Sequence, residues 1–201
     1  MVLLLWAYLA TLLALSPLLF FKWATSVPLK HLLQDPLHVL QAPSYIGLYS
    51  NLGILVWTAT ATLCFFCSAL LKTRKDERGT SSFLFYSGLL TLLLLGDDFF
   101  LLHEKVLPRL LKIGEGPTFI FYFVFTLFIV IRSRKIILQT NFLPFFFAFG
   151  FFAISIFLDE GHFNHLVVWE DIMKIFGMVS WFVYFLEICL KKLRKAVNFA
   201  V

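Results

Sequence analysis

The sequence predicts an all-α fold: a polytopic bundle of about six transmembrane helices with both termini in the cytoplasm. Of the 201 residues, 60% are hydrophobic and 14% are charged, which excludes a soluble domain. The long apolar runs lack the alternation that is typical of a transmembrane β-barrel. Lys and Arg gather in short clusters at the ends of these runs, as they do beside membrane helices. Since no repeat or second domain is apparent, we expect one integral membrane domain over residues 1–201.

The predicted spans follow the apolar runs in chain order. They are 2–21, 46–71, 82–106, 117–131, 136–158 and 167–190. No basic segment precedes the first run, so we expect a retained helix there and not a cleaved signal peptide. Thr80, Ser81 and Ser82 indicate the start of the third span, and Pro117 suits the first turn of the fourth.

The distribution of basic residues predicts the orientation of the spans. Most of them lie between spans two and three, between spans four and five, and after span six. These residues are Lys72, Arg74, Lys75, Arg78, Arg132, Arg134, Lys135, Lys191, Lys192, Arg194 and Lys195. Because cytoplasmic loops carry the excess of Lys and Arg, we expect the side that they share with both termini to be cytoplasmic. We expect these clusters to contact the bilayer surface and not nucleic acid, although the pI is near 9.2.

This orientation places all five histidines and most of the acidic residues at the outer end of the bundle. The histidines are His31, His38, His103, His162 and His165, and the acids are Asp35, Asp97, Asp98, Glu104, Glu115, Asp159, Glu160, Glu170 and Asp171. Titratable and metal-binding side chains therefore collect at this end. We expect His31 and His38 to be solvated, because their loop also contains Pro28 and Pro36.

Residues 96–104, with the sequence GDDFFLLHE, bring carboxylates into the end of the third predicted span. An ionised Asp in hydrocarbon costs at least about 2.5 to 3.5 kcal/mol, so these groups need a partner, a proton or water. On a continuous helix, Asp97 and Glu104 are nearly eclipsed, while Asp98 and His103 lie to either side of them. We expect this polar arc to face the inside of the bundle.

The polarity of the helices predicts that these carboxylates need a cation. Asp97, Asp98, Glu104, Asp159 and Glu160 all lie near helix C-termini, where the helix dipole disfavours negative charge. The cation could be a metal ion, a protonated His, or the ammonium group of a lysine.

Lysine offers two ways to balance this charge. Lys105 is seven residues from Asp98 on the same helix face. Lys174 lies about one turn beyond Glu170 and Asp171, which suit the first turn of span six. For Lys174 we expect an ion pair with Glu170 or with Asp97; the alternative is a structural role in holding span three to span six.

A metal site is a second way to balance the charge. Asp98, His103, His162 and His165 could supply four donors to Zn, Mn or Fe. The alternative is a set of ordinary hydrogen-bonded histidines at the membrane interface, because no established metal-binding motif is present. We interpret Cys64 and Cys67 as packing residues, since a thiolate is disfavoured in an apolar helix.

The acidic pattern resembles that of a group of proteins of uncharacterised function. Asp97-Asp98-x4-His103-Glu104 and Glu170-Asp171-x2-Lys174-x2-Gly177 resemble small polytopic bacterial membrane proteins with an acidic third helix and an acidic/Lys pair on the last. This resemblance implies a location in the bacterial inner membrane.

A more distant resemblance is to the alkaline-ceramidase-like intramembrane hydrolases, which combine helix-end Asp and His residues near one membrane face. Their pattern has seven helices, an intramembrane Ser and a His-x3-His pair, whereas this chain has His162-x2-His165 in a loop. A hydrolase is therefore implied only by analogy.

Three functions fit the sequence. The first is an enzyme, metal-dependent if the metal site exists, that acts on a lipid or another amphiphile in an acidic/His pocket at the outer end. There Asp97, Asp98 and Glu104 would bind a cation or exchange protons, His103 would be a ligand or general base, and Lys174 would balance the charge. The second is proton- or cation-coupled transport, against which stands the apolar character of the span midplanes. The third is a subunit whose carboxylates pair with the cations of another membrane protein.

Overall fold

The computed structural model describes residues 4–6, 8, 9, 11–13, 15, 16, 28, 33–160 and 167–198, with the side chains of 160, 167 and 196–198 excepted. The chain divides into two compact units, Met1–Leu48 and Tyr49–Val201. In the first unit, the short helix α3 (Pro36–Val39) begins at Asp35, whose carboxylate accepts hydrogen bonds from the backbone of Leu37 and His38. Half of the predicted span 2–21, and His31, lie outside the described residues.

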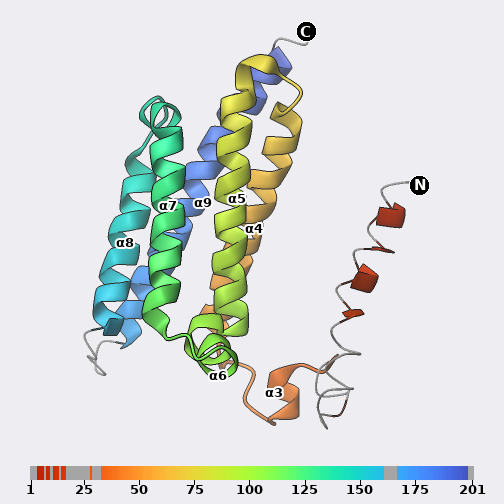
Figure 1. Cartoon of the computed structure of the whole chain (residues 1–201), viewed down its shortest axis with the longest axis vertical. Helices are drawn as coiled ribbons and strands as arrows, with labels where there is room; N and C mark the ends of the chain where they lie inside the picture. The colour runs from red at the N-terminus through yellow and green to blue at the C-terminus, as the bar shows by residue number, and fades with distance from the viewer. Residues whose placement is uncertain are drawn as a thin grey trace. The chain divides into compact units, whose positions relative to one another are not determined.

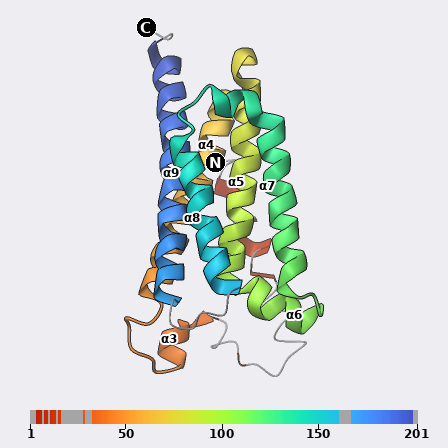
Figure 2. The same ribbon diagram turned by 90° about the vertical axis from the view of Figure 1, so that its left-hand side faces the viewer.

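Every regular element in the described part of the second unit is helical. In order they are α4 (Leu48–Leu71), the 3-10 turn η1 (Lys75–Glu77), α5 (Arg78–Phe100), the π-helical turn η2 (Leu102–Val106), α6 (Leu107–Leu110), α7 (Glu115–Leu138), α8 (Leu143–Glu160) and α9 (Val167–Asn198). The long helices α4, α5, α7, α8 and α9 lie side by side and alternate in direction (Figures 1 and 2). We call the end with η1, the α7–α8 turn and the C-terminus of α9 the basic end. The end with η2 and α6 is the acidic end.

Three helical segments in the described residues are long and apolar enough to cross a membrane: Leu48–Leu71, Lys75–Phe100 and Val168–Lys195. They correspond to the second, third and sixth predicted spans. Leu143–Asp159, which corresponds to the fifth predicted span, is apolar but shorter. The prediction of a helical chain is thus confirmed for the described residues, three of whose helical segments could span a membrane, and the number of six spans stays a prediction.

The predicted boundary between spans four and five is wrong. Residues 132–135 were expected to form a loop, but α7 continues through them to Leu138. The guanidinium carbon of Arg132 lies 5.7 Å from the centroid of the Tyr86 ring, and Ile137 is buried, so packing against α5 and the core continues past the cationic cluster. The turn comes instead at residues 139–142, where the Asn141 side chain accepts a hydrogen bond from the backbone of Leu143.

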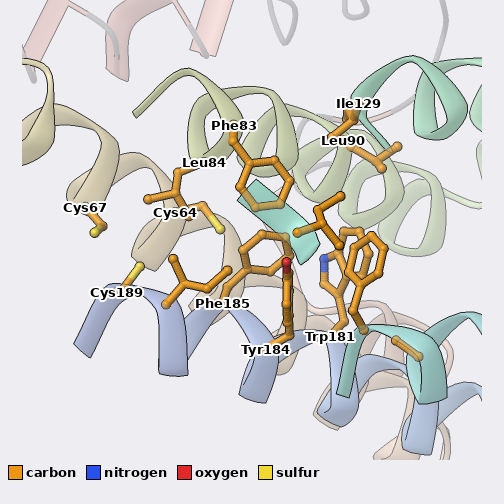
Figure 3. Packing of buried hydrophobic residues seen from close by; sticks show 14 of the residues in the cluster. Cys64, Cys67, Phe83, Leu84, Leu90, Ile129, Trp181, Tyr184, Phe185 and Cys189 are labelled. Atoms are coloured by element: carbon orange, nitrogen blue, oxygen red, sulfur yellow. The ribbon is translucent and has the colours of Figure 1, made fainter. Parts of the chain in front are cut away.

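The core is built around the contact between α5 and α9. The rings of Tyr184 and Phe185 on α9 lie against Phe83 on α5, and the Trp181 ring lies beside Leu90 (Figure 3). The Phe83 ring centroid lies 5.8 Å from that of Phe185 and 6.4 Å from that of Tyr184. Burying rings of this size supplies much of the packing energy of a helical core.

The three cysteines lie in this core as packing residues. Cys64, Cys67 and Cys189 are free thiols, each almost completely buried (Figure 3). This is the environment expected for the packing role predicted for Cys64 and Cys67. Next to them, Ser68 on α4 and Ser81 on α5 exchange hydrogen bonds to each other's backbone carbonyl at 2.7 and 2.8 Å, which holds the two helices together.

Small residues allow α9 to approach its neighbours closely. A Cβ atom at Gly177 would lie 2.6 Å from the Phe152 ring on α8, and one at Gly53 on α4 would lie 3.0 Å from the Met178 sulfur. The Phe152 ring also stacks on Trp57 of α4 at 5.7 Å between centroids. Gly177 therefore sets the distance between α8 and α9 and keeps Phe152 and Trp57 in place.

Candidate acid–base site at the acidic end

The helix α5 ends at Phe100, and the way it ends creates the site. Leu101 adopts a left-handed conformation with φ of 52°, and its N–H donates to the Asp97 carbonyl. The π-helical turn that follows then brings His103 back over the end of α5. A non-glycine residue rarely adopts this conformation, so the surrounding contacts must hold it.

Asp97 and His103 form a closely hydrogen-bonded pair. The His103 backbone N–H donates to Asp97 Oδ1 at 2.9 Å, and His103 Nδ1 lies 2.6 Å from Asp97 Oδ2. The Asp97 side chain is only 6% exposed. The expectation that Asp97 aligns with Glu104 and that His103 lies to one side is therefore wrong, because Leu101 interrupts the helix on which that geometry depended.

The remaining His103 nitrogen points toward a second carboxylate. His103 Nε2 lies 3.9 Å from Glu104 Oε1, and the Glu104 side chain is 48% exposed. On the α7 side, the Phe119 ring centroid lies 5.1 Å from that of His103. Asp97 thus fixes the ring through Nδ1, and Nε2 is the nitrogen that is left to exchange a proton.

The electrostatic environment of His103 raises the pKa of its imidazole above the usual value near 6.5. The main cause is the hydrogen bond to Asp97; partial burial opposes it, and the charges of Asp97, Glu104 and Glu115 reinforce it. The imidazolium form is therefore favoured by folding.

This shift predicts a pH dependence of stability. The extra stability from His103 should be fully present below about pH 6.5, the pKa in the unfolded chain, and should be lost as the pH rises through the higher folded pKa. We expect the difference in unfolding free energy between the wild type and His103→Gln to shrink over that interval, as measured by denaturant titrations in detergent at several pH values. A difference that stays constant or grows with pH would contradict the assignment.

Asp98 faces the other side of α5 and joins three helices. Lys174 Nζ on α9 donates to Asp98 Oδ1 at 2.7 Å, and the Trp57 indole N–H on α4 donates to Asp98 Oδ2 at 2.8 Å. The side chains of Asp98 and Lys174 are 15% and 38% exposed. Lys174 does pair with a carboxylate, as predicted, but that carboxylate is Asp98 and not Glu170 or Asp97.

The residue expected to reach Asp98 on its own helix does not do so. Lys105 was placed on the same face as Asp98, but it follows the break at Leu101 and is exposed. Lys174, from a helix 76 positions away in sequence, takes that role. The cation offsets the unfavourable position of Asp98 at the C-terminus of α5.

The comparison with protein families comes to one result. The family model described as "Domain of unknown function (DUF8692)" matches residues 2–188. The chain belongs to this family. Neither a curated protein nor a solved structure matches the DUF8692 chain, so the analogy with alkaline-ceramidase-like hydrolases has no support from these comparisons. The resemblance to an uncharacterised family is confirmed.

The predicted metal ligands do not come together in the described part of this DUF8692 chain. Asp98 is engaged by Lys174 and Trp57, whereas His103 is engaged by Asp97. His162 and His165 lie outside the described residues. Among residues 33–160 and 167–198, no group of three or more His, Cys, Asp or Glu side chains is arranged to hold a metal ion.

The other predicted charge partners surround Lys174 without direct contact. Glu170 is near Asp159, Asp171, Lys174 and Glu104, and all of these affect its electrostatic environment. None of them makes an ion pair with Lys174 within 4 Å in the described residues. The side chain of Glu160 lies outside those residues.

Two aromatic residues in the site were not predicted from the sequence. The Trp57 N–H is a donor to Asp98, and the Tyr122 phenol on α7 lies within interaction range of Asp97. The sequence feature that could have indicated them is a Trp or Tyr in an apolar helix, because its N–H or O–H group needs a hydrogen-bond partner there. Neither residue stands near Asp97 or Asp98 in sequence.

The basic end contains an ion pair that was also missed. Glu77 lies in sequence among the cationic residues that follow α4, but it is 6% exposed and accepts from Lys192 Nζ at 2.6 Å and from the Thr80 hydroxyl at 2.8 Å. An ion pair between a Lys on α9 and an acid on or next to α5 therefore lies at each end of the contact between these helices: Lys174–Asp98 at the acidic end and Lys192–Glu77 at the basic end.

Proposed function

We propose that the protein is an integral membrane protein of the bacterial plasma membrane that crosses the bilayer six times, with both termini in the cytoplasm. Three apolar helical segments of spanning length support the membrane location. The basic clusters near Lys72, Arg134 and Lys195 lie at one end of the helices, which supports the orientation. The acidic end then faces the outer leaflet.

At that end, we propose that the Asp97–His103 pair acts as a general acid–base catalyst on a lipid or another amphiphile. The observation that carries the proposal is the 2.6 Å contact between His103 Nδ1 and the buried Asp97 carboxylate. A buried carboxylate that accepts from Nδ1 fixes the tautomer in which Nε2 can take a proton, as in established catalytic triads. The hydrogen bond to Asp97, which raises the His103 pKa, stabilises the imidazolium that forms when Nε2 takes a proton.

The chemistry that this arrangement suits is hydrolysis. Neutral His103 would accept a proton from water at Nε2 while the water oxygen bonds to the carbonyl carbon of an ester. The imidazolium would then return a proton to the departing alkoxide as the ester C–O bond breaks. One water is consumed, and an acid and an alcohol are formed. Asp97 would stabilise the imidazolium between these steps.

The surroundings of the pair support an amphiphilic substrate. Phe99 and Phe100, at the end of α5 next to Asp97 and Asp98, are 58% and 61% exposed. The Phe119 ring lies against His103 itself. An apolar chain could rest on these rings while a polar headgroup reaches His103.

The test is turnover in vesicles. Wild-type protein in liposomes would be incubated with phospholipids, acylglycerols and ceramides, and the products measured by mass spectrometry. We expect Asp97→Asn to lower the turnover at least about a hundredfold, because the variant loses the charge that orients and stabilises His103. The control is Asp159→Asn, which removes an exposed acid at the same end and should keep full activity. No turnover of any of these lipids by the wild type would refute the enzyme proposal.

A second candidate function is proton-coupled transport, which one observation supports. A row of buried polar side chains runs along α5 between the two ends of the bundle. Its members are Asp97, Thr91, Ser87, Ser81 and Glu77. The sequence did not lead us to expect this row, because the middle of each predicted span looks apolar. The Ser87 hydroxyl is fully buried and has no hydrogen-bond partner in the described residues. A pH-driven flux in the same vesicles that is lost in Asp97→Asn, without lipid turnover, would favour this function.

The subunit hypothesis has less support than these two. Its reason was that buried carboxylates need cations from a partner protein. Asp97, Asp98 and Glu77 have cationic partners within the chain when His103 is protonated. Their charge therefore does not require a second protein.

A further inference from the structure

A cavity at the basic end is separate from the acid–base site. It has a volume of about 210 Å³ and lies between the end of α7, the α7–α8 turn and the last turns of α9. A single water needs only about 10–15 Å³ by this kind of measure, so a group of several non-hydrogen atoms fits. Its lining residues are Thr80, Ile136, Gln139, Thr140, Asn141, Tyr184, Glu187, Ile188, Lys191 and Lys192.

Charges of both signs line this cavity. Glu187 and Lys191 are one helical turn apart on α9, yet their charged groups do not pair within 4 Å. Glu187 Oε2 instead accepts from the Asn141 side chain at 3.1 Å. Because the Asn141 side chain also accepts from the N–H of Leu143, the first residue of α8, the turn holds the Glu187 carboxylate in place.

The other cation at the cavity is already occupied. Lys192 is 2.6 Å from the buried Glu77 carboxylate. Lys191 is exposed and makes no hydrogen bond or ion pair with any described residue. The cavity therefore presents the ammonium group of Lys191, which has no partner among the described residues, and the carboxylate of Glu187, which the neutral Asn141 amide holds in position.

The inner and lateral walls complete the site. At the inner end, the Thr140 hydroxyl donates to the Ile137 carbonyl and lies 3.1 Å from the Tyr184 hydroxyl, so both oxygens can accept a hydrogen bond from a ligand. At the sides, Ile136 and Ile188 form apolar walls. Leu138 and Leu190, each next to a lining residue in sequence, are 73% and 43% exposed, so exposed apolar side chains are present on the same turns of α7 and α9.

We propose that this cavity binds the headgroup of a zwitterionic phospholipid that carries a phosphate and a primary amine. The phosphate contacts Lys191, and the ammonium donates to Glu187. A purely anionic headgroup would meet the Glu187 carboxylate without a cation for it. A quaternary ammonium group has no N–H to donate to Glu187. The apolar walls select a lipid over a free zwitterion, because they continue toward the acyl chains.

The proposal is tested by lipid binding to the full chain in detergent micelles, followed by native mass spectrometry. The probes are phosphatidylethanolamine, phosphatidylcholine, phosphatidylglycerol and free phosphoethanolamine. We expect phosphatidylethanolamine to bind about tenfold more tightly than the other two lipids, since hydrogen bonds to a charged group are worth that much. Free phosphoethanolamine should bind far more weakly than the lipid.

Two variants assign the charges. Glu187→Gln keeps a hydrogen-bond acceptor for Asn141 and should abolish the preference for phosphatidylethanolamine over phosphatidylcholine. Lys191→Ala should weaken the binding of every phospholipid about tenfold. The matched control is Lys135→Ala, an exposed cation at the same end that does not line the cavity. All three positions are exposed, and circular dichroism verifies that the variants are folded.

Three results would overturn the proposal. One is equal binding of the three lipids by the wild type, or a preference for phosphatidylglycerol. Another is an unchanged lipid preference in Glu187→Gln together with unchanged affinity in Lys191→Ala. The third is free phosphoethanolamine binding as tightly as the lipid, which would assign the cavity to a soluble zwitterion.

Discussion

Replacing Lys174 by methionine should lower the free energy of unfolding by about 3 kcal/mol. The ammonium group lies 2.7 Å from Asp98 Oδ1, and its removal would leave a mostly buried carboxylate with the Trp57 N–H as its neutral donor. Losing one partner of a buried ion pair typically costs 3–5 kcal/mol, and the partial exposure of Lys174 places the expected value at about the low end of that range. Unfolding in mixed micelles, followed by tryptophan fluorescence, measures the change.

Two further variants separate the ion pair from other effects of the substitution. Lys105→Met removes an exposed cation at the same end and should change the stability by less than about 0.5 kcal/mol. Asp98→Asn combined with Lys174→Met removes both charges and should recover part of the loss, because no unpaired charge stays behind. If Lys174→Met were no more destabilising than Lys105→Met, the ion pair would have no structural role.

Adding one methyl group at Gly177 should also destabilise the fold, by about 2 to 3 kcal/mol. The new Cβ would lie 2.6 Å from the Phe152 ring, so either the ring or α8 must move, and overpacking of this kind typically costs about 1–3 kcal/mol. Phe152 also stacks on Trp57, which donates to Asp98. The displacement should therefore extend to the ion pair at the acidic end.

The natural control for Gly177→Ala is Gly150→Ala on α8. A Cβ at Gly150 meets nothing within 4 Å, so this substitution should stabilise the helix by about 0.5 to 1 kcal/mol through the loss of backbone freedom in the unfolded chain. The two variants make the same chemical change in neighbouring helices and should have opposite signs in thermal unfolding. Equal effects would show that Gly177 does not determine the approach of α8 and α9.

The helical fold and the position of the charged groups could be predicted from the sequence because both depend on local composition. Long apolar runs form helices in any packing arrangement, and the basic clusters mark one end of them whatever the contacts between helices are. The prediction that Lys174 needs a carboxylate was correct for the same reason, since an ammonium in an apolar helix is costly wherever it lies.

The partners of these charges could not be predicted in this way. The helical geometry assumed for residues 96–104 fails at Leu101, where a left-handed residue ends α5 and turns His103 toward Asp97. The choice of Asp98 over Glu170 for Lys174, and the donor Trp57, depend on how α4, α5 and α9 are rotated against each other. No periodicity within one helix contains that information.

The sequence by itself determined that this protein is helical, that several of its helices are long and apolar enough for a membrane, and that most acidic residues collect at one end while most Lys and Arg collect at the other. Only the tertiary structure decided which acid meets which base. The physical reason is that burial cost is a property of each residue, whereas an ion pair or hydrogen bond requires two groups at about 3 Å, and packing alone sets that distance.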